Sequence, residues 1–462
     1  MPAPPRIYAP SPSPHTPSAE AAPEPHALTL AQVATCWAPL AGSWLLMGLE
    51  LPAVSAVMAR LPHATVSLAA YGGVVFPLSL LIEAPILMLL TASTALSRDA
   101  RAYAVVRRFM FVTAGLLTAL HALLAFTPLF DVVVSALIGV PEPVRDPARI
   151  GLRIMLPWTL SIAYRRTQQG VLIRFDRGRA VTWGTLVRLG TLASVLALGS
   201  SVGRWPGIAV GTSAVACGVM SEAVFAGLAA RPVHRGLLAS APAAEPRLTM
   251  RAFVRFYNPL LLTPLLNFIS LPLAAAAMSR MPNALESLAA WPVLSGATFT
   301  LRSMGFAYNE VMVALLERWR PVPALRRFAW GLAVFSSSLL LLAAATRLGL
   351  WWFARGSALP QALAVLAWRS LWLLVPMGAV SVWQSFHQGV LVHAHRTRAV
   401  TESMALLLLV TAIALGIGVA WDALPGLVFA ALALTVGGVA QIAWLAHRSR
   451  PVLRELAARD HG

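Results

Sequence analysis

The segment from Leu51 to Ala70 reads LPAVSAVMARLPHATVSLAA, and the segment from Leu271 to Ala290 repeats it as LPLAAAAMSRMPNALESLAA, without a gap. A second pair repeats in the same way: QGVLIRFDRGRAVT starts at Gln169 and QGVLVHAHRTRAVT at Gln388. One single-residue deletion reconciles the offsets of the two pairs. Self-similarity at nearly half the chain length indicates duplication of a large unit. In a chain this apolar, it favours two related bundles of membrane helices.

Composition places the chain in a membrane. Of its 462 residues, 58% are hydrophobic and 12% are charged, whereas soluble proteins carry roughly 25% charged residues. Apolar runs of ~20 residues recur, each long enough to cross the bilayer as a helix. These runs are too long, and alternate too little, for the strands of a membrane barrel. The predicted fold class is therefore an all-α polytopic membrane protein.

Twelve spans are predicted, in two parallel six-helix repeats. The first six cover 30–58, 67–96, 105–128, 150–174, 179–202 and 206–230. The second six cover 252–279, 287–317, 326–350, 362–393, 398–420 and 424–447. Six is an even number, so both halves enter the membrane from the same side and are related by an axis along its normal.

Five regions follow from these spans. Residues 28–230 and 251–449 are the two six-helix bundles, joined by a cytoplasmic linker over 231–250. Residues 450–462 are expected to form a cytoplasmic tail. Residues 1–27 are rich in Pro, Ala and Ser and lack an apolar core, so they are expected to form a disordered cytoplasmic tail and not a signal peptide.

Arginine is the only basic residue type apart from histidine, and it gives the chain a net charge of +18. The arginines sit mainly in short loops between apolar runs, a pattern typical of membrane topology and not of nucleic-acid binding. Eighteen lie in the loops after even-numbered spans and in the linker: Arg98, Arg101, Arg107, Arg108, Arg174, Arg177, Arg179, Arg231, Arg235, Arg247, Arg251, Arg255, Arg318, Arg320, Arg326, Arg327, Arg396 and Arg398. Eight lie in the opposite loops: Arg60, Arg145, Arg149, Arg153, Arg204, Arg280, Arg347 and Arg355.

Two repeat-related spans carry polar stripes. Arg165 and Gln169 lie one helical turn apart in the fourth span, as do Gln384 and Gln388 in the tenth, so each pair shares a helix face. We expect these stripes to face each other across a central cavity. The alternative is that Arg165 and its neighbour Arg166 extend to lipid headgroups at the cytoplasmic mouth. The candidate substrate-binding residues are Arg165, Arg166, Gln169, Arg302, His387 and Gln388.

Acids inside spans require a reason, because a charge at mid-membrane costs at least ~2.5 kcal/mol. Glu50 and Glu83 have serine at the repeat-related positions and are candidates for ion coupling, with structural packing as the alternative. Glu222 aligns with a glutamine in the repeat and is expected to be a packing position, paired with Arg188.

No catalytic constellation is evident. The chain has no lysine for a phosphate-binding loop, and its histidines show no metal-ligand spacing. Its two cysteines, Cys36 and Cys217, fall inside apolar runs and indicate neither a disulfide nor a metal site. No enzyme activity, metal or cofactor is expected.

The chain resembles the multidrug/oligosaccharidyl-lipid/polysaccharide (MOP, MATE-like) exporter superfamily in three features. These are its two halves, the QGVL stretch at the end of the fourth and tenth spans, and the RTRAV loop that follows. Within this superfamily, two segments resemble the progressive ankylosis (ANK) transporter family. One is Glu50 to Gly72, and the other is the Ile269–Ser270–x–Pro272 pattern that is followed by Ser279–Arg280. The resemblance implies a V-shaped transporter that exports anionic metabolites such as citrate, ATP or pyrophosphate. The region of Arg165 and Arg166 departs from that family's spacing.

Two classes of function are consistent with these features. The first is a secondary transporter, an exporter of small organic or phosphate-bearing anions, since arginine forks match carboxylate and phosphate. The second is a lipid-linked precursor flippase or drug exporter of the same fold. The expected partners are a small anionic substrate and membrane lipids, without nucleic acid, and the chain is expected to be a monomer.

The arginine distribution makes a topological prediction. Both termini should lie in the cytoplasm and the chain in the inner membrane, because arginine-rich short loops stay inside. A reporter active only outside the cytoplasm, fused at the C-terminus, should be inactive, whereas the same reporter fused in the loop at Arg204 should be active. Activity of the C-terminal fusion would contradict the assignment.

Overall fold

The computed structural model describes residues 27–242, 245 and 247–459, except for the side chains of Pro259 and Arg459. All but one residue of the predicted N-terminal tail lie outside this range. The elements of the first half are α1 (Leu30–Gly48), α2 (Glu50–Met58), α3 (Ala64–Ala70), η1 (Tyr71–Val75), α4 (Phe76–Glu83), η2 (Ala84–Ile86), α5 (Leu89–Leu96), α6 (Ala100–Phe126), η3 (Asp131–Ile138), α7 (Glu142–Ile154), α8 (Leu156–Arg174), α9 (Gly178–Val202) and α10 (Gly207–Arg235).

The second half has the same plan. After the short α11 (Leu237–Ser240), its elements are α12 (Met250–Met278), α13 (Ala284–Leu315), α14 (Pro321–Ala345), α15 (Arg347–Trp351), η4 (Trp352–Gly356), α16 (Gln361–Leu374), α17 (Met377–His393), α18 (Thr397–Trp421) and α19 (Gly426–Arg459). Because α19 runs to Arg459, most of the tail predicted over 450–462 is helical. The linker is shortened in the same way, since α10 ends at Arg235.

Twelve membrane helices in two bundles are confirmed. Within the described residues, nine helical segments are long and apolar enough to cross a membrane, and α16 with α17, bent by 43°, makes a tenth. The remaining two spans are α8 and α13. Each interrupts its apolar sequence with arginine and amide side chains, and one of the two lies in each bundle.

The backbone repeats along with the sequence. His63 and Asn283, which occupy the same position in the two repeats, precede α3 and α13 in the left-handed conformation, with φ of 57° and 55°. Asp176 and His395, a second repeat-related pair, do the same after α8 and α17, with φ of 55° and 56°. L-residues rarely adopt this conformation. Its recurrence at related positions therefore supports duplication of a folded unit.

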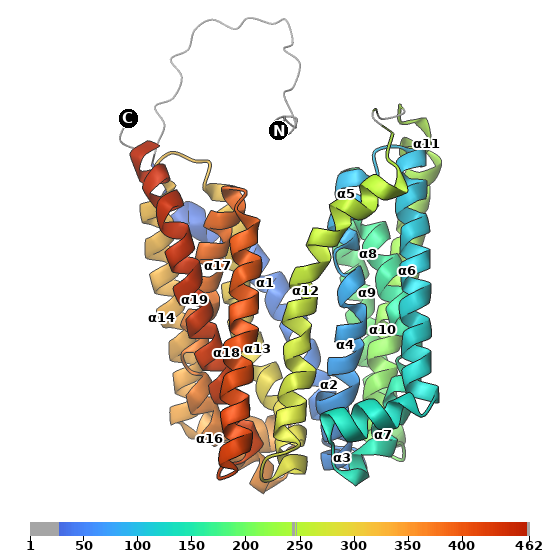
Figure 1. Ribbon diagram of the computed structural model, residues 1–462, viewed down its shortest axis with the longest axis vertical. Coiled ribbons are helices and arrows are strands. Elements are labelled where there is room, and N and C mark those ends of the chain that lie inside the picture. The colour runs from blue at the N-terminus through green and yellow to red at the C-terminus, as the bar shows by residue number, and fades with distance from the viewer. Residues whose placement is uncertain (1–26, 243–244, 246, 460–462) are drawn as a thin grey trace, which may run out of the picture.

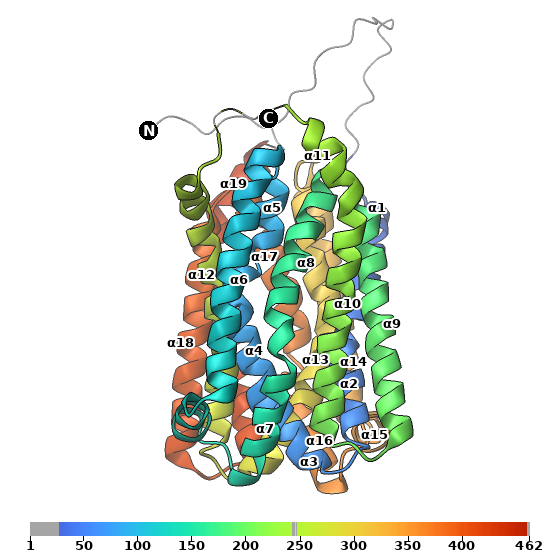
Figure 2. The same ribbon diagram turned by 90° about the vertical axis from the view of Figure 1, so that its right-hand side faces the viewer.

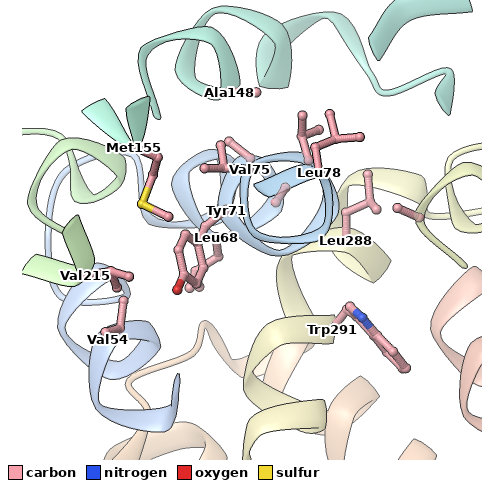
Figure 3. Close-up of a cluster of buried hydrophobic side chains, with 14 of the residues drawn as sticks. Val54, Leu68, Tyr71, Val75, Leu78, Ala148, Met155, Val215, Leu288 and Trp291 are labelled. Atoms are coloured by element: carbon pink, nitrogen blue, oxygen red, sulfur yellow. The ribbon is translucent and has the colours of Figure 1, made fainter. Parts of the chain in front are cut away.

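The bundles meet at the end of the molecule opposite the linker and diverge toward the end that carries α11 and the last turns of α19 (Figure 1). At the joined end, α3 and η1 pack on α13, where Tyr71 and Leu68 lie near Leu288 and Trp291 in one apolar cluster (Figure 3). A Cβ on Gly72 would come within 2.5 Å of Pro292. Gly72 and Pro292 are equivalent positions of the two repeats, so the axis that relates the halves passes through their contact.

Two helices cross from one bundle to the other. The indole of Trp37, on α1, donates to the carbonyl of Met304 on α13 at 3.0 Å. The hydroxyl of Tyr257, on α12, donates to the carbonyl of Pro85 at 2.6 Å, and its ring lies 4.9 Å from that of Phe109. Thus α1 packs against the second bundle and the start of α12 against the first.

A reciprocal pair of arginines ties the joined end together. Arg60, in the first half, donates to the carbonyl oxygens of Arg355 and Gly356 at 2.9 Å each. Arg280, in the second half, donates to the carbonyl oxygen of Leu137 at 2.7 Å. Both sets of acceptors lie at the ends of π-helices, η4 and η3, whose terminal carbonyls lack helical partners. We refer to Arg60, Arg280 and these carbonyls as the arginine latch.

Loss of the arginine latch should favour separation of the joined ends. Hydrogen bonds from charged donors are worth ~1.5–3 kcal/mol each, so the double variant Arg60→Gln/Arg280→Gln should raise the separated population by at least about tenfold. Electron–electron distances between spin labels at Ser201 and Ala423, in a chain whose cysteines are replaced, measure it. Arg204→Gln, at the same end, is the matched control and should leave the distances unchanged. Identical distributions in the double variant would exclude a latch.

Candidate functional site

The polar side chains of α8 concentrate in its middle turns. Arg165, Gln168 and Gln169 are buried there, although the helix is one of the twelve spans. A charge at such depth is tolerated when it faces the bundle interior and meets a partner. The surrounding helices α9, α10 and α2 each supply one charged residue to this region.

These residues form a buried charge network, consisting of Glu50, Arg165, Arg188 and Glu222. Arg165 and Glu222 form an ion pair, and Gln169 also donates to the Glu222 carboxylate at 3.0 Å. Arg188 lies 2.7 Å from the carboxylate of Glu50 and 3.6 Å from that of Glu222. The network joins α2, α8, α9 and α10, and its two arginines and two glutamates compensate one another.

This geometry changes the roles predicted for several residues. The expected pairing of Glu222 with Arg188 is confirmed, but Arg165 is the nearer partner. Arg165 and Gln169, predicted to line a cavity, both bind the carboxylate of Glu222. Glu50, proposed for ion coupling, is engaged by Arg188. Their predicted roles in transport remain hypotheses.

Arg166 differs from its neighbour. It is half-buried, and within the described residues no carboxylate lies within 4.0 Å of it and its Nε atom has no hydrogen-bond partner. Among the acids, Glu83 on α4 acts on it most strongly through space. Glu83 is 3% exposed and, in the same part of the chain, forms no ion pair. The two residues therefore interact electrostatically but are not joined.

The second bundle contributes Arg302, on α13. Arg302 is half-buried, and among the described residues it has no ion pair and its Nε atom has no hydrogen-bond partner. Its guanidinium lies 5.2 Å from the ring centroid of Phe306, and Trp44, from the crossing helix α1, packs on the same ring at 6.0 Å. An aromatic face offers a cation some attraction, but it leaves the charge uncompensated.

The remaining predicted residues lie on separate faces of α17. His387 forms a hydrogen bond of 2.8 Å with the hydroxyl of Ser449, on α19. Gln388 lies beside the amide of Asn309, on α13, at 3.5 Å. The structure therefore does not gather the six predicted residues into one cluster. His387 faces a neighbouring helix of its own bundle instead.

Sequence reasoning missed the latch, and it did not assign Glu222 to a site. Arg60 and Arg280 occupy the same position in the LPAVSAVMAR and LPLAAAAMSR repeats, so a signal existed. Glu222 gave no such signal, because its partner depends on helix rotation. Across the described residues there is also no group of three metal-ligating side chains.

Glu222 should be essential to stability. Glu222→Gln leaves Arg165 and Arg188 short of one acid, and breaking a buried pair costs ~3–5 kcal/mol. Thermal unfolding in detergent should show a large decrease in midpoint. The matched control is Glu455→Gln, which removes the exposed pair with Arg396 and should cost below ~1 kcal/mol. Equal, small effects of both substitutions would show that the network does not stabilise the fold.

No family model and no curated protein matches this sequence. Solved structures do match. An inward-facing MATE multidrug transporter of the MOP superfamily is 13% identical, with a TM-score of 0.70, over 90% of this chain and 98% of that one. The lipid II flippase MurJ, inward closed, is 12% identical, with a TM-score of 0.63, over 89% and 88%. An outward-facing MATE transporter is 14% identical, with a TM-score of 0.52, over 92% and 99%. The chain has the fold shared by these proteins.

Proposed function

We propose that this protein is an alternating-access transporter that exports small organic or phosphate-bearing anions. Its fold is that of membrane transporters, and it is more similar to an inward-facing MATE structure than to an outward-facing one. The bundles diverge toward the end with the linker and are joined by the arginine latch at the other. This arrangement supports an inward-open state. It also supports a location in the inner membrane with both termini in the cytoplasm.

The observation that carries the anion assignment is that, among the described residues, a half-buried arginine inside a span lacks an ion pair in each bundle: Arg166 in the first and Arg302 in the second. Arginine keeps its charge at any physiological pH, since its pKa exceeds ~12 in water and it is rarely deprotonated in proteins. Arg166 and Arg302 therefore require water or an anion. The buried charge network cannot compensate them, because its own charges already balance. A guanidinium on each bundle would let one carboxylate- or phosphate-bearing ligand engage both.

The charge balance argues against a cationic drug as substrate. Outside the network, Arg166 and Arg302 are accompanied by two acids in the spans, Glu83 and Glu310; Glu310 is exposed, and its carboxylate accepts a hydrogen bond from Trp44. The sum of these charges is positive when Glu83 carries the proton that the coupling proposal below assigns to it. A positive cavity attracts anions and repels cations. The finer resemblance to the progressive ankylosis family is in agreement with an anion, and it rests on the sequence motifs alone.

The second candidate is a lipid-linked precursor flippase or a drug exporter. The similarity to MurJ favours the flippase, and the pyrophosphate of a lipid-linked precursor would also require arginine. The anion exporter and the flippase can be distinguished by their need for the lipid portion of the substrate. A flippase should bind a polyprenyl pyrophosphate far more tightly than free pyrophosphate.

Anion binding should depend on both unpaired arginines. Arg166→Gln and Arg302→Gln should each weaken binding by ~1.5–3 kcal/mol, the value of a hydrogen bond to a charged group. Calorimetry of the purified variants with citrate, pyrophosphate and ATP measures this, with tetraphenylphosphonium as a cationic comparison. Arg204→Gln removes an arginine at the joined end and is the matched control. Variants that bind anions like the wild type would contradict the site.

Glu83 is the better of the two proposed coupling residues, because Glu50 is held by Arg188. A buried acid without an ion pair can bind and release a proton during transport. Glu83→Gln should therefore fold normally and transport at a rate that no longer varies with pH. Glu83→Asp, which keeps the carboxyl group, should retain the pH dependence. An unchanged pH profile of Glu83→Gln, measured in proteoliposomes, would assign this acid to packing.

A further inference from the structure

The outer face of the first bundle contains a polar pocket that the proposed transport path does not use. Helix α8 lies between α6 and α10 on the face turned away from the second bundle (Figure 2). Near the end that carries the linker, these three helices and α11 enclose a pocket of about 490 Å³. From its position on the outer face and its chemistry, we propose that this pocket binds the phosphate headgroup of an anionic phospholipid.

The floor of the pocket is a chain of hydrogen bonds. The amide of Gln168 donates to the hydroxyl of Tyr103 at 3.0 Å, and its oxygen accepts from Nε2 of His234 at 2.7 Å. Tyr103 is 7% exposed and Gln168 is 2% exposed. The hydroxyl hydrogen of Tyr103 has no acceptor within the described residues, and Nδ1 of His234 is buried there without a partner. The Tyr103 hydroxyl therefore remains available to donate to a ligand, whereas Nδ1 of His234 is an acceptor in the neutral ring and a donor only when the ring is protonated.

The rim of the pocket is positively charged. Arg107, on α6, and Arg231, on α10, both line it and are exposed, and the lining includes no acid. The Arg107 guanidinium lies 5.9 Å from the ring of Tyr103, directly beside the floor. Neither arginine forms an ion pair in the part of the chain that the structure describes. Two arginines over a free hydroxyl donor suit a phosphate.

The surface below the pocket is apolar and suits acyl chains. Along α8, Leu160 precedes Tyr164 and Gln168 by successive helical turns on the same face, and it is 41% exposed. Phe111, on α6, and Val224, on α10, are 50% and 61% exposed. The pocket is thus continuous with the lipid-facing surface of three helices. A soluble anion would not use this surface, whereas a phospholipid would place its chains along it.

The pocket does not follow from the fold alone. In the second repeat, the positions of Tyr164 and Gln168 are occupied by Trp383 and His387. There the indole of Trp383 packs against Trp330 at 5.0 Å and fills the space. In the first bundle, a Cβ on Gly227 would lie 2.5 Å from the Tyr164 hydroxyl, so the glycine leaves room for this side chain.

Lipid binding to the purified, delipidated protein tests the proposal. Native mass spectrometry with phosphatidylglycerol, with phosphatidylcholine of the same chains, and with glycerol 3-phosphate should show preferential binding of phosphatidylglycerol. Arg107→Gln/Arg231→Gln should weaken it by at least about tenfold, the loss expected for two charged contacts. The control Arg108→Gln/Arg235→Gln removes the same charge from a position next to Arg107 and from one a helical turn beyond Arg231. Neither position lines the pocket, so binding should change less than about twofold.

Three results would overturn the proposal. If Arg107→Gln/Arg231→Gln binds phosphatidylglycerol as tightly as the wild type, these two arginines do not bind the headgroup. If both double variants weaken binding equally, the effect of charge is diffuse and not specific to the pocket. Displacement of phosphatidylglycerol by an equal concentration of glycerol 3-phosphate would indicate a site for a soluble anion. Because Arg166 and Arg302 lie elsewhere, the outcome is independent of the proposed transport function.

Discussion

Arginine inside a membrane helix cannot discard its charge, and the structure is organised around this constraint. Each such residue needs an acid, an array of carbonyl oxygens, water or a ligand. Arg165 and Arg188 meet Glu222 and Glu50 inside the first bundle. At the joined end, in the loops, Arg60 meets carbonyl oxygens of the opposite half. These solutions hold the four helices of the network together and tie one bundle to the other.

Duplication supplies a symmetric scaffold, and the differences between its copies indicate where specific properties arise. Repeat-related residues meet at the axis, as Gly72 does with Pro292. Each half also contributes one arginine to the arginine latch. By contrast, among the described residues the buried charge network lies in the first bundle and has no counterpart in the second. At the position corresponding to Glu222, the second bundle has Gln441, which contacts Ser403 and Met404. In the part of the chain that the structure describes, one bundle thus carries a compensated ionic core and the other a neutral one, and Arg166 and Arg302 lie in their spans without an ion pair.

The sequence predicts the scaffold well because duplication and apolar runs are long-range signals. Twelve helices and two halves follow from them. Element ends are less predictable: α7 is a separate, strongly amphipathic helix, and its many charged residues keep most of it out of the apolar runs by which spans are recognised. The site is least predictable. Arg165 and Arg166 are adjacent, and about 100° of helix rotation, which the sequence does not reveal, decides which one meets Glu222. Helix rotation likewise decides that His387 meets Ser449 on α19.

The most direct test of the account is the sign of the charge that the protein moves. Purified protein in liposomes on a solid-supported membrane reports transported charge as a current. An inward gradient of citrate or pyrophosphate should give a current of the sign expected when negative charge enters the liposomes, alone or in exchange for another ion. The double variant Arg166→Gln/Arg302→Gln should abolish this current. Currents driven by tetraphenylphosphonium but by no anion, and retained in the double variant, would contradict the account.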